Sequence, residues 1–350
     1  MESYITTSWE TSLRLASAEA SKVLVIADSN LPSSYSKSVL DICQNACPTK
    51  VLSLEGGEGV KTLSKVSEVY LQLDKMDADR KSLVVCLGGG TITDMGGFVA
   101  STYKRGVSLA HLPTTVLAMV DAAIGGKTGV NTQMQKDIGL LKNQIGTFYS
   151  PKMVGMNQHW LQSLKQEEVL SGWGEMVKHA LIVGGDHLTQ LMSLRPNLRD
   201  LAPLILHSAR MKEAVVQRDE KELGERASLN LGHTVGHAIE SLAYDGGYKI
   251  KHGVAVAWGL VFTLEASVAK MGFDTTLAEK LQHWIVSEIA NGIEFDKGDV
   301  IWRKMSQDKK NVKGNVTDVL MMAPGEVIWD FVWQREEFLF LWAQFRQRYA

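Results

Sequence analysis

The stretch SLVVCLGGGTITD, residues 82–94, carries the clearest indication of the fold. It opens with an apolar, β-branched run over 82–87, which is typical of a buried strand, and runs directly into three glycines at 88–90. Glycines at such a turn allow close backbone approach to a ligand, and the N–H groups of a following helix can bind a pyrophosphate. Because the usual G-x-G-x-x-G spacing is absent, a tight turn at a strand end is the alternative interpretation.

Short apolar runs of the same kind occur on both sides of this stretch. They occupy residues 23–27, 51–54 and 107–112, and helical spacing covers 62–76. Alternation of strand, loop and helix is typical of a parallel sheet covered by helices. Asp28 closes the first run, where its carboxylate could accept a hydrogen bond from a ribose hydroxyl; an exposed loop aspartate is the alternative.

The pattern becomes mostly helical after about Gln158. Helices are predicted over 165–183, 198–219, 228–244, 253–271 and 276–290. The sequence therefore predicts an α/β domain over 1–156 and an all-helical domain over 157–350. We interpret the aromatic residues near the C-terminus as core packing; they are Trp329, Phe331, Trp333, Phe338, Phe340, Trp342 and Phe345.

The composition argues against several classes of function. The 350 residues are 45% hydrophobic and carry a formal net charge of −2, which favours neither a nucleic-acid nor a membrane partner. Cys43, Cys47 and Cys86 form no C-x-x-C pair, so neither a disulfide framework nor a cysteine zinc site is expected. We expect no signal peptide, no apolar run approaching the roughly 18 residues of a membrane helix, and a cytoplasmic location.

A second glycine-rich motif spans Asp121 to Asn131, with two glycines directly before Lys127. Such a loop can wrap an anion, because the glycines admit its backbone and the lysine supplies a point charge. The spacing differs from that of a P-loop. Lys142 and Asn143 follow in an otherwise apolar segment. Each lysine alone is more simply explained as a solvated surface residue, but their shared surroundings favour an anion site.

The third motif group contains Glu175, His233, His237 and His252. His233 and His237 are four residues apart and so share a helix face. Two histidines and one glutamate form a recurring catalytic zinc set that leaves a position open for substrate. The metalloprotease motif H-E-x-x-H is absent. The alternative is that each histidine is a satisfied core or capping residue.

Positive charge gathers in the same segments. It is carried by Lys178, Lys212, Arg226 and the pair Lys309 and Lys310. Together with Asn230 and His237, these residues could hold a phosphate and several hydroxyls, whereas singly each basic residue suits a solvated face. The spacing of Asn230, His233 and His237 predicts that all three project from one helical face.

Taken together, these motifs resemble the 3-dehydroquinate synthase family. The resemblance runs from about Val23 to Gly314. It rests on GGGTITDMGGFVASTYKRG, LPTTVLAMVDAAIGGKTGVN, KNQIGTFYSP, SGWGEMVKH, RASLNLGHTVGHAIE and KHGVAVAWG. It implies an N-terminal Rossmann-like nucleotide-binding domain, a C-terminal helical metal-binding domain, an active site in the cleft between them, and a homodimer.

The resemblance also implies a role for each matching residue. The metal ligands would be Glu175, His233 and His252. The NAD contacts would be Asp28, Glu58, Lys61, Gly89, Gly90, Asp94, Thr114, Thr115, Lys127 and Lys142. The substrate positions would be Asp121, Lys127, Asn143, Lys178, Lys212, Arg226, Asn230, His237 and one of Lys309 and Lys310. Arg105 would reach the phosphate pocket of the neighbouring subunit.

The implied reaction converts 3-deoxy-D-arabino-heptulosonate 7-phosphate (DAHP), a sugar-acid phosphate, into 3-dehydroquinate and phosphate. It would use one divalent metal, zinc or cobalt, and NAD that is regenerated in each cycle. Three alternatives stay open: a cyclase of sedoheptulose 7-phosphate or another sugar phosphate, a metal-dependent polyol or glycerol-phosphate dehydrogenase, and a catalytically dead scaffold.

Overall fold

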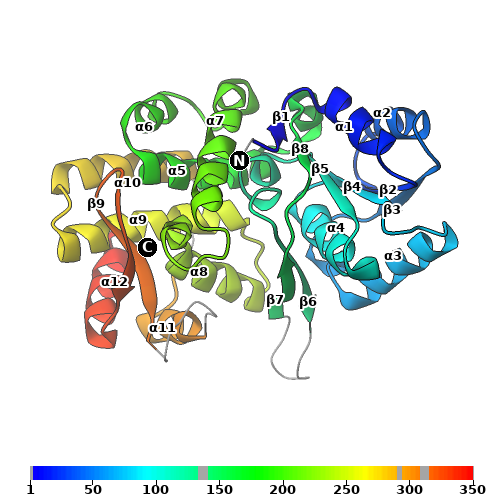
Figure 1. The fold of residues 1–350 in the computed structure, drawn as a ribbon. Coiled ribbons are helices and arrows are strands. Elements are labelled where there is room, and N and C mark those ends of the chain that lie inside the picture. Colours follow the sequence, from blue (N-terminus) through cyan, green and yellow to red (C-terminus); the bar gives the residue numbers. More distant parts are fainter. Residues whose placement is uncertain (1–2, 133–140, 290–293, 308–314, 350) are drawn as a thin grey trace. The chain divides into compact units, whose positions relative to one another are not determined.

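A computed structural model describes residues 3–132, 141–289, 294–307 and 315–349 (Figure 1). The chain divides into two compact units, the first formed by 1–165 with 205–213 and the second by 166–204 with 214–350. The domain boundary after Met156 stays a prediction, since compact units are not a test of independently folding domains.

The first unit is built on a six-stranded sheet in which every neighbouring pair is parallel. Its strands, in spatial order, are β1 (Ile5–Thr6), β8 (Met153–Gly155), β5 (Ser108–Pro113), β4 (Leu83–Gly88), β2 (Val23–Asp28) and β3 (Thr49–Leu54). The predicted parallel sheet is confirmed, and the four predicted runs form its β2, β3, β4 and β5. Strands β1 and β8 were missed because two or three residues are too few to show a pattern.

Helices cover both faces of this sheet. They are α1 (Trp9–Ala18), α2 (Ser33–Gln44), α3 (Leu63–Lys75) and α4 (Gly90–Thr102). Alternate residues of β2 point to opposite faces, so that Val23 and Val25 pack with α1 and α2 while Leu24 and Ile26 pack with α3 and α4. Burial on both faces explains why these strands are continuously apolar.

A hairpin outside the main sheet completes the first unit. Its strands β6 (Lys127–Thr132) and β7 (Leu141–Phe148) are antiparallel and follow a short π-helix over Ala118–Ala122. The hairpin was not predicted, because its sequence shows glycines and polar residues in place of strand alternation.

The second unit is mainly helical. Its helices are α5 (Gln166–Val183), α6 (Gly185–Met192), most of α7 (Leu198–Arg218), α8 (His233–Asp245), α9 (His252–Met271), α10 (Thr275–Ile289), α11 (Gly298–Ser306) and α12 (Arg335–Tyr349). The predicted fold class is confirmed, with one correction: the unit is not all helical, because β9 (Thr317–Ala323) and β10 (Glu326–Val332) form an antiparallel hairpin. The sequence between them, Pro324-Gly325, supplies the turn.

Helix α9 corrects the expectation about apolar runs. Among the described residues it is the one helix long and apolar enough to cross a membrane, with 20 residues. Most of its residues are buried within the second unit, including Ala257, Leu260 and Phe262. A helix that is packed on several sides needs no polar face, which accounts for its composition.

The C-terminal aromatic residues pack largely as predicted. Phe338, Trp342 and Phe345 are fully buried and surround Phe262, with ring centroids 5.4–5.5 Å from it. The core interpretation was wrong for Trp329 and Phe340, which are 41% and 66% exposed. Strand β10 has no buried residue, and Phe340 lies outside the buried face of α12.

Candidate metal centre and nucleotide site

Helices α5 and α9 cross at a distance that only glycine permits. A Cβ added to Gly174 would lie 1.9 Å from the carbonyl oxygen of Gly253, and one added to Gly253 would lie 1.7 Å from that of Ser171. The Gly253 N–H also donates to the Ser171 hydroxyl over 3.1 Å. This contact of two backbones brings the neighbouring residues Glu175 and His252 together.

A second close crossing joins α8 to α9. A Cβ on Gly259 would lie 1.9 Å from the carbonyl oxygen of Gly232, the residue that precedes α8. Gly232 itself has a φ of 74°, which favours glycine. The left-handed turn starts α8 at His233 and places this side chain beside His252, with ring centroids 5.4 Å apart.

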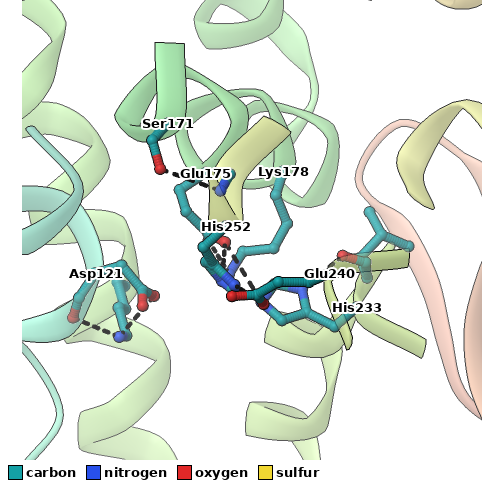
Figure 2. A network of polar contacts seen from close by, with 10 residues as sticks. Asp121, Ser171, Glu175, Lys178, His233, Glu240 and His252 are labelled. Carbon is teal, nitrogen blue, oxygen red and sulfur yellow. Dashed lines mark hydrogen bonds and ion pairs between the residues drawn. The ribbon is translucent and has the colours of Figure 1, made fainter. Parts of the chain in front are cut away.

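Glu175 lies at the centre of the resulting cluster (Figure 2). Its Oε1 is 3.3 Å from Nε2 of His233 and 3.4 Å from Nε2 of His252, and its Oε2 contacts Nζ of Lys178. Glu175 is completely buried and Lys178 is 1% exposed. Helix α5 and the two consecutive helices α8 and α9 therefore direct one carboxylate and two imidazole nitrogens at a common point.

The Nδ1 atom of each imidazole forms a hydrogen bond on the side away from Glu175 Oε1. Nδ1 of His233 lies 3.1 Å from the carbonyl oxygen of Leu231, and Nδ1 of His252 lies 3.1 Å from Oε2 of Glu240. Partners of this kind orient metal-binding histidines and leave Nε2 for the ion. The donor set and its support fit a divalent metal, and His237 lies close enough for the ligand atoms of the three histidines to fall within 4.8 Å of one another.

The charges of the cluster follow from burial and from these contacts. Burial alone would raise the pKa of Glu175, but Lys178 and the two histidines hold it well below its usual value. Burial lowers the pKa of His233 to about 3, which keeps it neutral. His252 also loses solvation, yet its hydrogen bonds to Glu175 and Glu240 raise its pKa to about 10. An ionised carboxylate and a neutral imidazole are the forms that bind a metal, so Glu175 and His233 already have these forms, whereas His252 would have to release a proton to the solvent when an ion binds.

The prediction that Asn230, His233 and His237 share one helical face is wrong for Asn230. Asn230 belongs to a 3₁₀ turn over Glu225–Asn230, and the left-handed Gly232 separates this turn from α8. Asn230 and His233 therefore do not share a helical face. The Asn230 side chain instead donates to Oε1 of Glu222 over 2.8 Å. His237 lies on α8 one turn after His233, as expected from the spacing.

The glycine stretch has the predicted strand–turn–helix form. Strand β4 ends at Gly88, Gly89 is the N-cap, and α4 begins at Gly90. The Thr114 N–H donates to the Gly88 carbonyl over 3.0 Å, and the Thr115 hydroxyl accepts the Ala118 N–H over 3.0 Å. The two threonines thus order the loop after β5 beside the N-terminus of α4, where backbone N–H groups favour an anion.

Asp28 closes β2 as predicted. Its Oδ1 accepts the backbone N–H of Asn30 over 2.9 Å and the side-chain amide of Asn30 over 3.1 Å. The backbone of Gly56 lies against the same carboxylate, since a Cβ there would be 2.2 Å from Oδ2. The carboxylate is therefore fixed at the carboxyl edge of the sheet, where nucleotide ligands bind in folds of this type.

Several of the predicted NAD and substrate residues form one network in the first unit. Lys61 is 2% exposed and donates to Oδ2 of Asp94 over 2.5 Å and to Oδ1 of Asn143. Burial raises the pKa of Asp94, and Lys61 opposes this effect. Glu58 joins the network through the side chain of Asn131.

Two residues of these sites were missed from the sequence. Asn131 is buried in the network, although only its place at the end of the motif GKTGVN signals it. Glu240 supports His252, and its spacing of three residues from His237 on α8 could have indicated a shared face.

The remaining predicted residues are distributed as follows. Lys212 is 7% exposed and binds Asp121, with Nζ 2.7 Å from Oδ1. Arg226 is 1% exposed and donates to the Glu220 carbonyl, whereas Lys127 and Arg105 are exposed. The side chain of Lys142 and the residues Lys309 and Lys310 lie outside the described part of the chain. The roles assigned to all these residues stay predictions.

The fold has close counterparts among solved structures. 2-Deoxy-scyllo-inosose synthase complexed with carbaglucose-6-phosphate, NAD+ and Co2+ matches with a TM-score of 0.84 and 24% identity, over 98% of this chain and 95% of that one. ValA (2-epi-5-epi-valiolone synthase) from Streptomyces hygroscopicus subsp. jinggangensis 5008, with NAD+ and Zn2+ bound, matches with a TM-score of 0.81 and 20% identity, over 99% and 98%. The fold is thus that of the sugar phosphate cyclases.

Sequence comparison narrows this class. The family model for the 3-dehydroquinate synthase N-terminal part matches residues 51–171, and that for the C-terminal part matches residues 172–311. The 3-dehydroquinate synthase of Leptospira interrogans serogroup Icterohaemorrhagiae serovar copenhageni is 38% identical over 326 residues, which cover 91% of this chain and 87% of the relative. The chain belongs to the 3-dehydroquinate synthase family.

Proposed function

We propose that this chain is a 3-dehydroquinate synthase, which converts DAHP into 3-dehydroquinate and phosphate in the shikimate pathway of aromatic amino acid biosynthesis. The observation that carries the proposal is the buried Glu175 carboxylate with Nε2 of His233 and His252 directed at it, in a chain of this family. A scaffold without catalytic activity would have no need to keep this costly arrangement of buried polar groups.

The metal would be held by Glu175, His233 and His252, and zinc and cobalt both suit this donor set. When bound, the metal supplies a Lewis acid that lowers the pKa of a substrate hydroxyl, and NAD supplies a hydride acceptor that is restored later in the cycle. Glu240 would orient His252 throughout, and Lys178 would balance the charge of Glu175.

The nucleotide would bind in the first unit. Gly89 and Gly90 would present the N-terminus of α4 to its pyrophosphate, and Asp28 would accept hydrogen bonds from its ribose. Thr114 and Thr115 would complete this edge of the sheet. The network of Glu58, Lys61 and Asp94, together with Lys127 and Lys142, would supply the other contacts.

The substrate would be bound by charged and amide groups. Arg226, Asn230 and His237 would meet the carboxylate and hydroxyls of DAHP, with the guanidinium giving a charge-assisted bond. Asp121, Lys212 and Asn143, and one of Lys309 and Lys310, would complete the set. The ion pair between the buried Lys212 and the partly exposed Asp121 keeps both charged groups ordered before substrate arrives.

A comparison of substrates tests this proposal. DAHP, sedoheptulose 7-phosphate and glucose 6-phosphate are supplied in parallel at equal concentration with NAD and zinc, and phosphate release is followed. We expect kcat/KM for DAHP to exceed that for either sugar phosphate without a carboxylate by about tenfold to a hundredfold. This factor corresponds to the free energy of a hydrogen bond to a charged group. A clear preference for a sugar phosphate without a carboxylate would assign the chain to a cyclase that acts on that sugar phosphate.

We also propose that the enzyme is a cytoplasmic homodimer in which Arg105 reaches the phosphate pocket of the neighbouring subunit. Arg105 is exposed and has a φ of 67°, a backbone conformation that residues other than glycine keep when their surroundings impose it and that often occurs at functional sites. Mixing Arg105→Ala protein with a Glu175→Gln protein should restore activity, because a hybrid dimer contains one intact site. Subunit exchange without recovered activity would contradict the shared site, and fractionation of cells tests the location.

A further inference from the structure

Asn131 lies near the end of β6 and bonds at both ends of its side chain. It is 2% exposed. Its amide nitrogen donates to Oε2 of Glu58 over 2.7 Å, and its amide oxygen accepts the backbone N–H of Asn143 over 3.1 Å. Its own backbone N–H donates to the carbonyl oxygen of Lys61 over 2.7 Å. One buried side chain therefore connects two groups with different proposed ligands.

The register of the hairpin explains why Asn143 needs this partner. Val130 pairs with Ile145, whereas Thr132 pairs with Leu141, so β7 carries extra residues opposite Asn131. Residues in such a bulge lose their regular ladder partners and can redirect a side chain toward a site. Asn143 lies in this bulge.

The backbone of Asn143 has a φ of 55°, in the left-handed region. Residues other than glycine keep this conformation when their surroundings impose it, and asparagine tolerates it better than most. Asn131 holds the backbone N–H of Asn143, and Lys61 holds the side-chain oxygen. The position of the Asn143 side chain thus depends on Asn131, whose amide group is held in one orientation by its bonds to Glu58 and Asn143.

We infer that Asn131 is a positioning residue that sets Glu58 for the nucleotide and Asn143 for the substrate at the same time. This inference rests on the proposed function, in which Glu58 contacts NAD and Asn143 contacts DAHP. A single amide that bonds to both makes nucleotide binding and the order of the β7 bulge interdependent.

The substitution Asn131→Asp separates the two ends of the side chain. The new carboxylate keeps an acceptor for the Asn143 N–H but faces the carboxylate of Glu58. We expect NAD affinity to fall by about tenfold to a hundredfold, the range for a hydrogen bond to a charged group, with a smaller change in KM for DAHP. Gln144→Glu, an equal change of charge at an exposed neighbour in β7, is the matched control and should leave NAD affinity near that of the wild type.

Adding Glu58→Gln to Asn131→Asp restores a donor opposite an acceptor, since the new amide can donate to the new carboxylate. The double variant should therefore bind NAD more tightly than Asn131→Asp alone, although Glu58→Gln alone weakens binding. A role in packing alone predicts additive losses. A double variant no better than Asn131→Asp, or an Asn131→Asp protein equal to the control, would overturn the inference.

A measurement on the wild-type protein supports the test if a variant fails to fold. NAD binding should slow hydrogen exchange at the Asn143 amide, and unchanged exchange at saturating NAD would overturn the inference. A wild-type protein that neither binds NAD nor converts DAHP would instead refute the proposed function, and the inference with it. The two failures are therefore distinguishable.

Discussion

Replacement of His252 by alanine is expected to abolish conversion of DAHP and to remove the metal while leaving the fold intact. Nε2 of His252 lies 3.4 Å from Oε1 of Glu175, so the substitution deletes one of three proposed ligands. Loss of an outer partner of a metal-binding histidine costs about 10- to 100-fold in metal affinity, and loss of a ligand should cost more. The side chain is 27% exposed at the first position of α9, so little core packing is lost.

Metal content and thermal unfolding test this prediction without relying on activity. Wild-type protein should bind one divalent ion per chain and unfold at a higher temperature with zinc than without it, because a ligand of the native state stabilises that state. His252→Ala should lose both properties. His283→Ala, at an exposed histidine of α10, is the matched control and should keep them. Full metal content and activity in the His252→Ala protein would remove this residue from the metal site.

Replacement of Gly253 by alanine should have the largest effect on stability. A Cβ at this position would lie 1.7 Å from the carbonyl oxygen of Ser171, and backbone cannot rotate away as a side chain can. Helices α5 and α9 would have to separate, with a loss of about 3 kcal/mol or more in the free energy of unfolding. This loss would exceed the gain of about 1 kcal/mol that alanine normally brings to a helix. Separation would also move Glu175 away from His252.

Denaturant unfolding measures the effect. Gly59→Ala is the control, since a Cβ there meets nothing within 4 Å and its backbone has no positive φ. It should change the free energy of unfolding by less than about 1 kcal/mol. A Gly253→Ala protein as stable as this control would show that the two helices do not meet through their backbones.

The sequence predicted the elements whose patterns are local. The runs that form β2, β4 and β5 are apolar because both faces of the sheet are covered, and the glycines after β4 mark the turn into α4. Glu175, His233 and His252 could be grouped by residue type, but their meeting depends on helix crossings that involve residues far apart in the chain.

The features that were missed depend on tertiary contacts. Asn230 has the spacing of a helical partner of His233, yet Gly232 in the left-handed region ends the turn between them. The role of Asn131 follows from a bulge in β7 that no local pattern reveals. Phe340 differs from Phe338 in the face of α12 on which it lies, whereas Trp329 belongs to β10, a strand with no buried residue.

The proposed function is tested most directly by a stoichiometric assay of the purified protein with zinc, excess DAHP and a far smaller amount of NAD. All of the DAHP should be converted, with equal amounts of phosphate and 3-dehydroquinate released and no accumulation of NADH, because the overall reaction involves no net oxidation. Accumulation of one NADH for each substrate consumed, with the reaction stopping when NAD is exhausted, would contradict the proposal and identify a dehydrogenase.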